Sequence, residues 1–261
     1  MAKTKVYFLD GGSCVIDGFH VYWNVGPAGE IRFPCYSVLV DHAEGRFLLD
    51  TSFDMEHTQK VLPFEKPMQT KEQTIPGGLS LVGLRPEDIT HVVNSHLHFD
   101  HVGGNKHLKN AVTICHRLEY EVCQSPQPFE RLGYSDLSFA PPEIAKDQAV
   151  AGFNPKFELV TGDQEIAKGL WLFETPGHSA GHYSIMVELE DRRPMLFAFD
   201  NANTKKNLET GIICSFHLDP AANVKSVERM KELAEKHDAE IFYSHDPELF
   251  PNYLKPPEHY S

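Results

Sequence analysis

The segment Ser95–His101 carries four side chains that bind metal ions in proteins, placed within six positions: His96, His98, Asp100 and His101. In extended backbone, the first two histidines point to the same side because a single leucine separates them, whereas the adjacent aspartate and histidine diverge. The segment follows the apolar run Ile89–Asn94, which we interpret as a buried strand. One short loop at a strand end could therefore contribute ligands to two ions.

Three further residues of ligand type follow predicted strands: His178, Asp200 and His245. Strand ends are where a rigid scaffold presents chemistry, so we expect these residues to join the histidine-rich loop. Together the two sets hold five histidines and two aspartates, which is enough for two ions. Imidazole and carboxylate ligands without thiolate suit Zn²⁺, and also Fe, Mn or Co.

The elements that must position these residues are mostly short strands. Alternating apolar runs separated by turn signals such as Gly11-Gly12 predict an antiparallel meander in residues 1–50, with strands at Lys5–Leu9, Ser13–Ile16, Tyr36–Val40 and Arg46–Leu49. A second group is predicted at Phe157–Thr161, Leu170–Glu174, Tyr183–Leu189, Met195–Phe199 and Ala239–Tyr243. Asp219 and Pro220 begin the clearest helix, which extends to about His237. Two strand groups with helices predict an α/β (α+β) fold, a four-layer sandwich of two packed sheets with helices outside.

Composition limits the function classes. The chain of 261 residues can bury a sizeable core, and its net charge of −13 argues against nucleic acid as a partner. The five cysteines form no C-x-x-C pair, so we expect reduced and mostly buried thiols. No apolar run is long enough for a signal peptide or a membrane span, and we therefore expect a soluble cytoplasmic protein with no membrane partner.

The combination of Ser95–His101, Thr175–His178, Asp200 and His245 resembles the metallo-β-lactamase superfamily, and within it the N-acyl homoserine lactonase and 4-pyridoxolactonase branch. The resemblance extends from Val6 to His245 and implies one αβ/βα sandwich domain over residues 1–261. It also implies a binuclear centre with two divalent metal ions, most simply Zn²⁺. One ion would be held by His96, His98 and His178, the other by Asp100, His101 and His245, with Asp200 as the bridge.

Three residues near these motifs have other expected roles. His182 has no place among the seven ligands, so we expect it to support the ligands or the fold. Asp50, at the end of an early predicted strand, is expected to orient ligand histidines or their loop rather than bind metal. Ser52 stands where the family usually has glycine, which predicts a local change in that loop.

The resemblance implies a mechanism in which a hydroxide shared by two ions attacks a ring carbonyl and Asp100 carries the proton to the leaving atom. Homoserine lactonases place a tyrosine at the position of Asn203, and an amide cannot act as an acid at neutral pH. Either Asn203 makes a weaker contact with the oxyanion, or another residue such as Tyr134 replaces the tyrosine, or the substrate differs. Asn203 as an ordinary loop residue is the remaining alternative.

Aromatic residues could line a substrate pocket or simply pack the core; the candidates are Trp23, Phe53, Phe64 and Tyr134. The leading hypothesis is hydrolysis of a small cyclic ester, either 4-pyridoxolactone-like or acyl-homoserine-lactone-like. A cyclic amide or carbamate of the lactam or benzoxazolinone type is the alternative small cyclic carbonyl substrate. A non-enzymatic, zinc-stabilised binding protein is a further hypothesis, disfavoured because seven ligands leave two ions with open positions. Apolar residues between Leu62 and Leu84 are compatible with a homodimer.

Overall fold

A computed structural model describes residues 3–261, so Met1 and Ala2, where the expected single domain begins, lie outside the described residues. The first of its two sheets has the order β1-β2-β3-β4-β5-β6. Strands β1 to β3 pair antiparallel, and β3 to β6 pair parallel. Their bounds are β1 Lys5–Asp17, β2 Glu30–His42, β3 Gly45–Leu49, β4 His91–Val93, β5 Val112–His116 and β6 Lys156–Val160.

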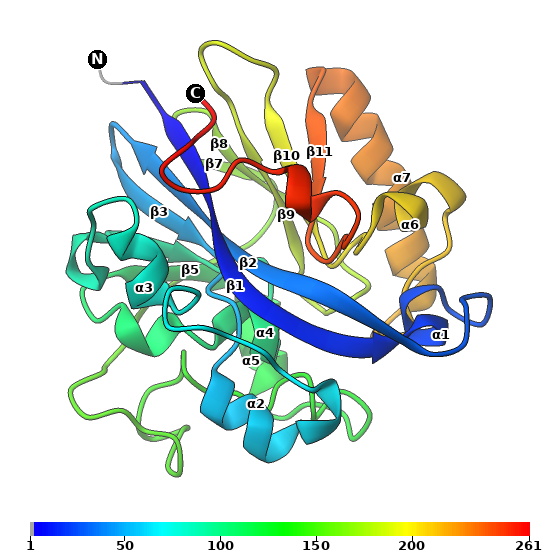
Figure 1. Cartoon of the computed structure of the whole chain (residues 1–261), viewed down its shortest axis with the longest axis horizontal. Coiled ribbons are helices and arrows are strands. Elements are labelled where there is room, and N and C mark those ends of the chain that lie inside the picture. The colour runs from blue at the N-terminus through cyan, green and yellow to red at the C-terminus, as the bar shows by residue number, and fades with distance from the viewer. Residues whose placement is uncertain (1–2) are drawn as a thin grey trace.

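The second sheet has the order β11-β10-β9-β8-β7 and is antiparallel except for the parallel pair β10 and β11. Its strands are β7 Gln164–Ala167, β8 Leu170–Glu174, β9 Tyr183–Val187, β10 Met195–Phe199 and β11 Glu240–Tyr243. The long strands β1 and β2 cross the face of the molecule beside this sheet (Figure 1).

The main core lies between the two sheets and follows the two-residue period of the strands. On β2, Val38 and Val40 point into this core, whereas Leu39 between them packs on the opposite face. On β10, Phe197 belongs to the same core and Leu196 packs on the outer side. Each sheet is thus buried on both faces.

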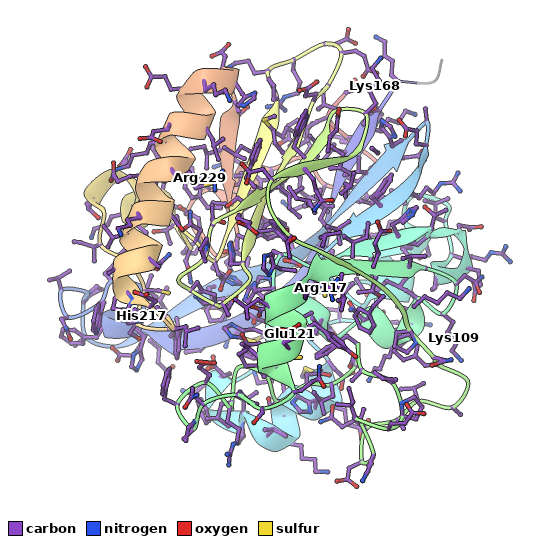
Figure 2. The ribbon with its side chains drawn as sticks, turned by 180° about the vertical axis from the view of Figure 1, so that it is seen from behind. Lys109, Arg117, Glu121, Lys168, His217 and Arg229 are labelled. Carbon is purple, nitrogen blue, oxygen red and sulfur yellow. The ribbon has the colours of Figure 1, made fainter. Side chains whose placement is uncertain are left out.

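Helices cover the two outer faces, which completes four layers. Helix α7 (Pro220–His237) packs Val227 and Met230 on the outside of the second sheet. Helices α3 (Ile75–Ser80) and α5 (Arg117–Cys123) cover the first sheet from the other side. Figure 2, which views the molecule from behind, shows α5 at the label of Glu121 and α7 at the label of Arg229. The remaining helices are short: α1 Gly18–Val21, α2 Met55–Val61, α4 Phe99–Val102, α6 Lys205–Thr210, and the 3₁₀ turns Pro63–Glu65, Pro86–Asp88, Asn105–His107 and Phe250–Asn252.

The expected four-layer fold is confirmed, with differences in detail. β1 is one 13-residue strand, because Gly11-Gly12 produces a shift of register between Asp10 and Ser13 instead of a turn. Strand β7 and helices α1, α2 and α6 were not anticipated. The five cysteines are buried free thiols, as expected.

Within residues 3–261, no helix combines the length and the apolar composition that crossing a bilayer requires.

Candidate metal centre

Strand ends from both sheets bring the seven candidate ligands together. The loop after β4 supplies residues 96–101, and the turn after β8 supplies His178. Asp200 directly follows β10, and His245 follows β11. Their side-chain nitrogen and oxygen atoms form two clusters, each with all its ligand atoms within 4.8 Å of one another: His96, His98 and His178; and Asp100, His101, Asp200 and His245.

The first cluster consists of three imidazoles. Nδ1 of His98 lies 3.0 Å from Nε2 of His96 and 3.0 Å from Nε2 of His178. A tetrahedral ion at 2.0–2.1 Å from each nitrogen would require separations of about 3.4 Å, so a small outward movement of the rings accommodates it. Burial lowers the pKa of both His98 and His178 to about 3. At neutral pH the rings therefore keep the lone pairs that a metal ion needs.

In the second cluster, two carboxylates face two imidazoles. Nε2 of His245 lies 3.1 Å from Oδ1 of Asp200 and 3.4 Å from Oδ2 of Asp100. Nε2 of His101 lies 3.3 Å from the same Asp200 oxygen. Burial opposes a charge on His101, but Asp100, Asp200 and Asp50 outweigh it and raise its pKa well above the usual value. This cluster therefore attracts positive charge, which a metal cation supplies.

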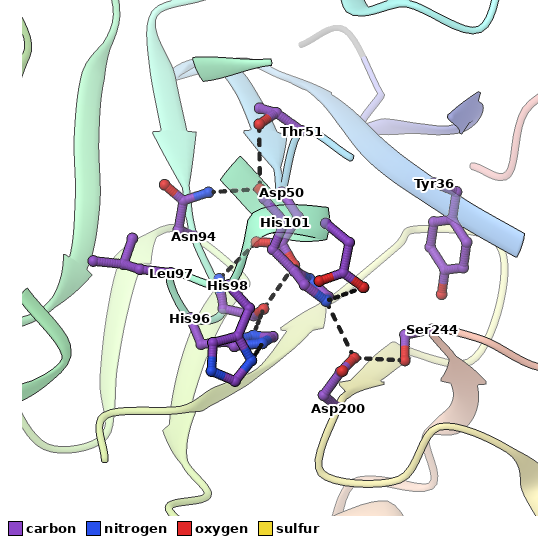
Figure 3. A network of polar contacts seen from close by, with 12 residues as sticks. Tyr36, Asp50, Thr51, Asn94, His96, Leu97, His98, His101, Asp200 and Ser244 are labelled. Carbon is purple, nitrogen blue, oxygen red and sulfur yellow. Dashed lines mark hydrogen bonds and ion pairs between the residues drawn. The ribbon is translucent and has the colours of Figure 1, made fainter. Parts of the chain in front are cut away.

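Asp200 belongs to both clusters by geometry. Its Oδ1 faces His101 and His245, whereas its Oδ2 lies 3.5 Å from Nε2 of His178 in the first cluster. Ser244 donates a hydrogen bond of 2.9 Å to Oδ1, and Figure 3 shows this serine on the opposite side of Asp200 from His101. One carboxylate thus presents an oxygen to each cluster, as the expected bridging role requires.

The outer nitrogens of the second cluster are already engaged. Nδ1 of His101 lies 2.6 Å from Oδ2 of Asp50, and Nδ1 of His245 lies 2.8 Å from the carbonyl oxygen of Pro34. In contrast, the buried Nε2 atoms of both histidines face Oδ1 of Asp200, at 3.3 Å from His101 and 3.1 Å from His245, in a geometry that forms no hydrogen bond within residues 3–261. Buried polar atoms are rarely left in this state, and histidine ligands characteristically hold an acceptor at the nitrogen remote from the ion. The donor set therefore fits two metal ions.

Asp50 orients the loop as anticipated from its position. Its carboxylate accepts hydrogen bonds from the backbone N–H of Ser95 at 2.7 Å and from the Ser95 hydroxyl at 2.6 Å, in addition to the contact with His101 (Figure 3). Nearby, Ser52 adopts a positive φ of 56°, a conformation that favours glycine. Its hydroxyl donates to the carbonyl oxygen of Gly11, whose missing side chain leaves room for it.

His182 lies outside both clusters. Its ring centroid is 5.3 Å from that of His96, and its Nδ1 lies 2.8 Å from the Thr175 hydroxyl. The buried Nε2 is without a hydrogen-bond partner in the described part of the chain. Its placement agrees with the expectation of a supporting residue.

Sequence analysis did not single out Glu119 on α5, which is fully buried beside the first cluster. One oxygen, Oε1, accepts from the N–H of Leu97 at 3.1 Å and from the Tyr134 hydroxyl at 2.8 Å. The other, Oε2, accepts from the N–H of Gly181 at 2.8 Å. The carboxylate therefore ties the loop of His96 and His98 to the turn that follows His178.

A cavity of about 1450 Å³ opens over the clusters, and its wall includes Asp100, His178, Asp200 and His245. Three of the four proposed pocket aromatics, Trp23, Phe64 and Tyr134, line it. The prediction for Phe53 was wrong. This ring is buried against Phe33, Leu62 and Phe99 and does not contribute to the cavity wall. It packs beneath the loop because its apolar area is better buried there than at the cavity surface.

The two candidates for the role of the family tyrosine differ in availability. The Tyr134 hydroxyl is buried and donates to Glu119, so only the ring, with its centroid 4.7 Å from that of His98, borders the centre. Asn203 lines the cavity, and its buried Oδ1 has no hydrogen-bond partner within residues 3–261. Tyr134 therefore offers no free hydroxyl to a substrate, whereas the Asn203 amide is available.

Comparison with known proteins agrees with this geometry. The family model of the metallo-beta-lactamase superfamily matches residues 31–245. An N-acyl homoserine lactonase of Bacillus cereus is 31% identical over 268 residues, covering 97% of this chain and 100% of the relative. One from Rhizobium radiobacter is 30% identical, with 100% of both chains covered.

Solved structures agree. An N-acyl homoserine lactone hydrolase with the product N-hexanoyl-L-homoserine bound at its catalytic metal centre has a TM-score of 0.83, at 30% identity and with 100% of both chains covered. These matches span the whole fold and the motifs that bring the two clusters together. The chain therefore belongs to the metallo-beta-lactamase superfamily and, within it, to the N-acyl homoserine lactonase family.

Proposed function

We propose that this protein hydrolyses the ester bond of a small lactone ring at a centre of two divalent metal ions, with Zn²⁺ as the ion that the ligands suit best. The observation that carries the proposal is Asp200, which presents one oxygen to each ligand cluster at the wall of the large cavity. The lactonase family supports the ester as the bond that is cleaved.

In this proposal each cluster holds one ion: the first is bound by His96, His98 and His178, the second by Asp100, His101 and His245, with Asp200 shared. Two divalent ions held by these residues would supply a water molecule of lowered pKa as the nucleophile and would polarise the substrate carbonyl. Asp50 holds His101 in place through Nδ1, and Pro34 does the same for His245.

Asp100 and Asn203 are the proposed catalytic residues that contact the substrate. Asp100 lies in the cavity wall beside His245 and would deliver the proton to the ring oxygen as the ester bond breaks. Asn203 would donate an amide hydrogen bond to the carbonyl oxygen as negative charge develops there. We expect Asp100→Ala and His98→Ala to abolish turnover; unchanged kcat in either variant would reject the mechanism.

A substrate assay tests which kind of ring the enzyme opens. Purified protein is tested on N-hexanoyl-homoserine lactone, 4-pyridoxolactone and a benzoxazolinone, with ring opening followed by chromatography. Hydrolysis of one or both lactones supports the proposal, and we expect the fused-ring 4-pyridoxolactone to be the better substrate because aromatic side chains line the cavity. Inactivity on all three compounds would reject it.

Because Asn203 stands where homoserine lactonases have a tyrosine, a cyclic amide or carbamate is the second candidate substrate. The amide side chain cannot donate a proton as an acid at neutral pH, and the hydroxyl of Tyr134 is occupied by Glu119. The cavity wall with Asn203 therefore suits a substrate whose leaving group needs less acid assistance. The phenol oxygen of a benzoxazolinone is such a leaving group. Faster hydrolysis of the benzoxazolinone than of either lactone would favour this second function.

The remaining proposals concern partners. The net charge of −13 disfavours nucleic acid, and we propose no membrane partner. Exposed apolar side chains at Phe64, Met68 and Leu81 are consistent with a homodimer, which light scattering coupled to gel filtration tests directly. A monomeric mass at working concentrations would reject the dimer.

A further inference from the structure

A carboxylate outside the two ligand clusters shares their cavity. Glu65, at the end of the 3₁₀ turn Pro63–Glu65, lines the wall together with Asp100 and His245. The residue is only 8% exposed, and its buried Oε2 has no hydrogen-bond partner within residues 3–261. The metal centre already has its ligands, so this acid is not needed there.

A buried carboxylic acid without a partner lowers the stability of the folded protein. Any buried polar atom in this state destabilises the folded protein, and more so when it is charged. Burial raises the pKa of Glu65 to about 7; Asp100 acts in the same direction and His245 opposes it. A leucine would avoid this cost, so packing alone does not account for the glutamate.

Within residues 3–261, no lysine or arginine forms an ion pair with this carboxylate. Lys66, the next residue, forms an ion pair with Glu30 instead. The cavity lysines are also engaged, Lys205 with Glu209 at 3.6 Å and Lys206 over the ring of Tyr22 at 4.5 Å. The partner of Glu65 is therefore to be sought in a molecule bound in the cavity.

The segment that carries Glu65 is fastened to β1 and β2. Both terminal nitrogens of Arg32 donate to the carbonyl oxygen of Lys66, at 3.3 Å each. Ser13 and Met68 exchange two backbone hydrogen bonds of 2.9 Å. The backbone on both sides of Glu65 is thus held in place before a substrate arrives, which limits the positions that its side chain can take.

We propose that Glu65 is a specificity-determining residue that accepts a hydrogen bond from an N–H or O–H group of the lactone substrate. The inference rests on the proposed function and adds the substrate class: lactones with a donor near the ring, such as an exocyclic amide or a ring hydroxyl. A lactone with only alkyl substituents leaves the buried oxygen unpaired on binding and is disfavoured.

The test compares substrates with and without a donor on the metal-loaded protein. Wild type, Glu65→Gln and Glu65→Leu are assayed on N-hexanoyl-homoserine lactone, on 4-pyridoxolactone and on γ-decalactone, which has no donor. Glu56→Gln, at an exposed glutamate of α2 outside the cavity wall, is the matched control. Calorimetry with N-hexanoyl-L-homoserine measures binding without turnover.

For at least one donor-bearing lactone we expect kcat/KM to fall about 10-fold in Glu65→Gln and 30-fold or more in Glu65→Leu, mainly through KM. γ-Decalactone should change less than threefold, and the control should match wild type. If the amide is the donor, N-hexanoyl-L-homoserine should bind at least fivefold more weakly to both variants.

Three outcomes would overturn the inference. Equal losses on all lactones would indicate a general effect on folding or catalysis, and the absence of any loss would show that Glu65 makes no contact. In both cases lactone hydrolysis by the wild type would leave the proposed function standing. Wild-type inactivity on every lactone would reject the proposed function and this inference with it.

Discussion

At the scale of single residues, the centre is built from side chains whose outer polar atoms are already bonded. His101 is held by Asp50 and His245 by the carbonyl of Pro34, so each ring presents only Nε2 to the second cluster. Such contacts fix the orientation of a ligand before an ion arrives and increase its basicity. Rings oriented in this way lose little conformational freedom when metal binds.

Substitution of Glu119 tests whether hydrogen bonds around the ligands maintain the affinity for metal. Both of its oxygens accept hydrogen bonds, so Glu119→Gln must turn an NH₂ group toward a donor, either Gly181 or Leu97 with Tyr134. We expect zinc affinity to fall about 10-fold or more. Competition with a chromogenic chelator measures this directly, and excess zinc should partly restore kcat.

The matched control is Glu121→Gln on the same helix, where the side chain faces solvent (Figure 2). It should bind zinc like the wild type. Wild-type affinity in Glu119→Gln would show that this carboxylate supports the fold alone.

Glu65 predicts a pH-dependent stability difference. Its pKa is raised from 4.5 to about 7, so between these values the folded protein binds more protons than the unfolded chain, and stability falls as pH rises. Glu65→Gln removes this loss. The free energy of unfolding of Glu65→Gln should therefore increase relative to that of the wild type from pH 5 upward. The difference should level off above pH 7 at about 3 kcal/mol. Urea unfolding of the metal-free proteins measures the difference, and a pH-independent difference would contradict the raised pKa.

The sequence identifies residues whose spacing follows from strand geometry. The clustering of all seven candidate ligands could be predicted because each lies in a segment that follows a strand end and has a side chain of ligand type. Glu119 could not, because its partners are backbone N–H groups 22 and 62 positions away, and any residue type supplies these. The prediction that Phe53 lines the cavity failed for a related reason, since an aromatic ring after a strand packs equally well under a loop or into a cavity.

At the scale of elements, the pair β1 and β2 anchors the segment that borders the cavity. Arg32 on β2 bonds to Lys66, and Ser13 on β1 pairs with Met68. The substrate-facing part of this segment is therefore an extension of the sheet and not a free lid.

Removing the arginine contact should loosen this segment. In Arg32→Ala we expect faster amide hydrogen exchange across residues 63–69 and a modest increase in KM, with global stability lowered by about 1 kcal/mol or less because the contact is exposed. Arg46→Ala, which removes a part-buried ion pair between Arg46 on β3 and Asp41 on β2, is the control and should leave these amides unchanged. Unchanged exchange in Arg32→Ala would show that the Ser13–Met68 pairing is sufficient.

Elements with strong local signals were predictable. Helix α7 begins after Asp219, which accepts from the N–H of Ala222, with Pro220 in its first turn, as the sequence indicated. Glycine pairs are ambiguous, since Gly11-Gly12 predicts a turn but shifts the register within one strand. Helices as short as α1, α2 and α6 depend on tertiary contacts, because a few residues cannot offset the cost of nucleation.

At the scale of the whole molecule, the centre joins the two sheets. In the first cluster, His96 and His98 come from the first sheet and His178 from the second; in the second cluster, Asp100 and His101 face Asp200 and His245 in the same way. Each ion would therefore bind residues of both sheets. Metal binding is thus coupled to the packing of the entire molecule.

Removing the metal should accordingly destabilise the whole fold. At a free zinc concentration a thousand times Kd, one site contributes about 4 kcal/mol, and in a chain of this size each kcal/mol shifts Tm by about 2–4 °C. Chelation by EDTA should therefore lower Tm by about 10 °C or more in a single transition, because both sheets share the ions. EDTA already saturated with zinc is the control and should leave Tm unchanged. Elemental analysis confirms that the metal has been lost. If Tm then stays constant, the two sheets hold together without the ions. If two separate transitions appear, the sheets unfold independently.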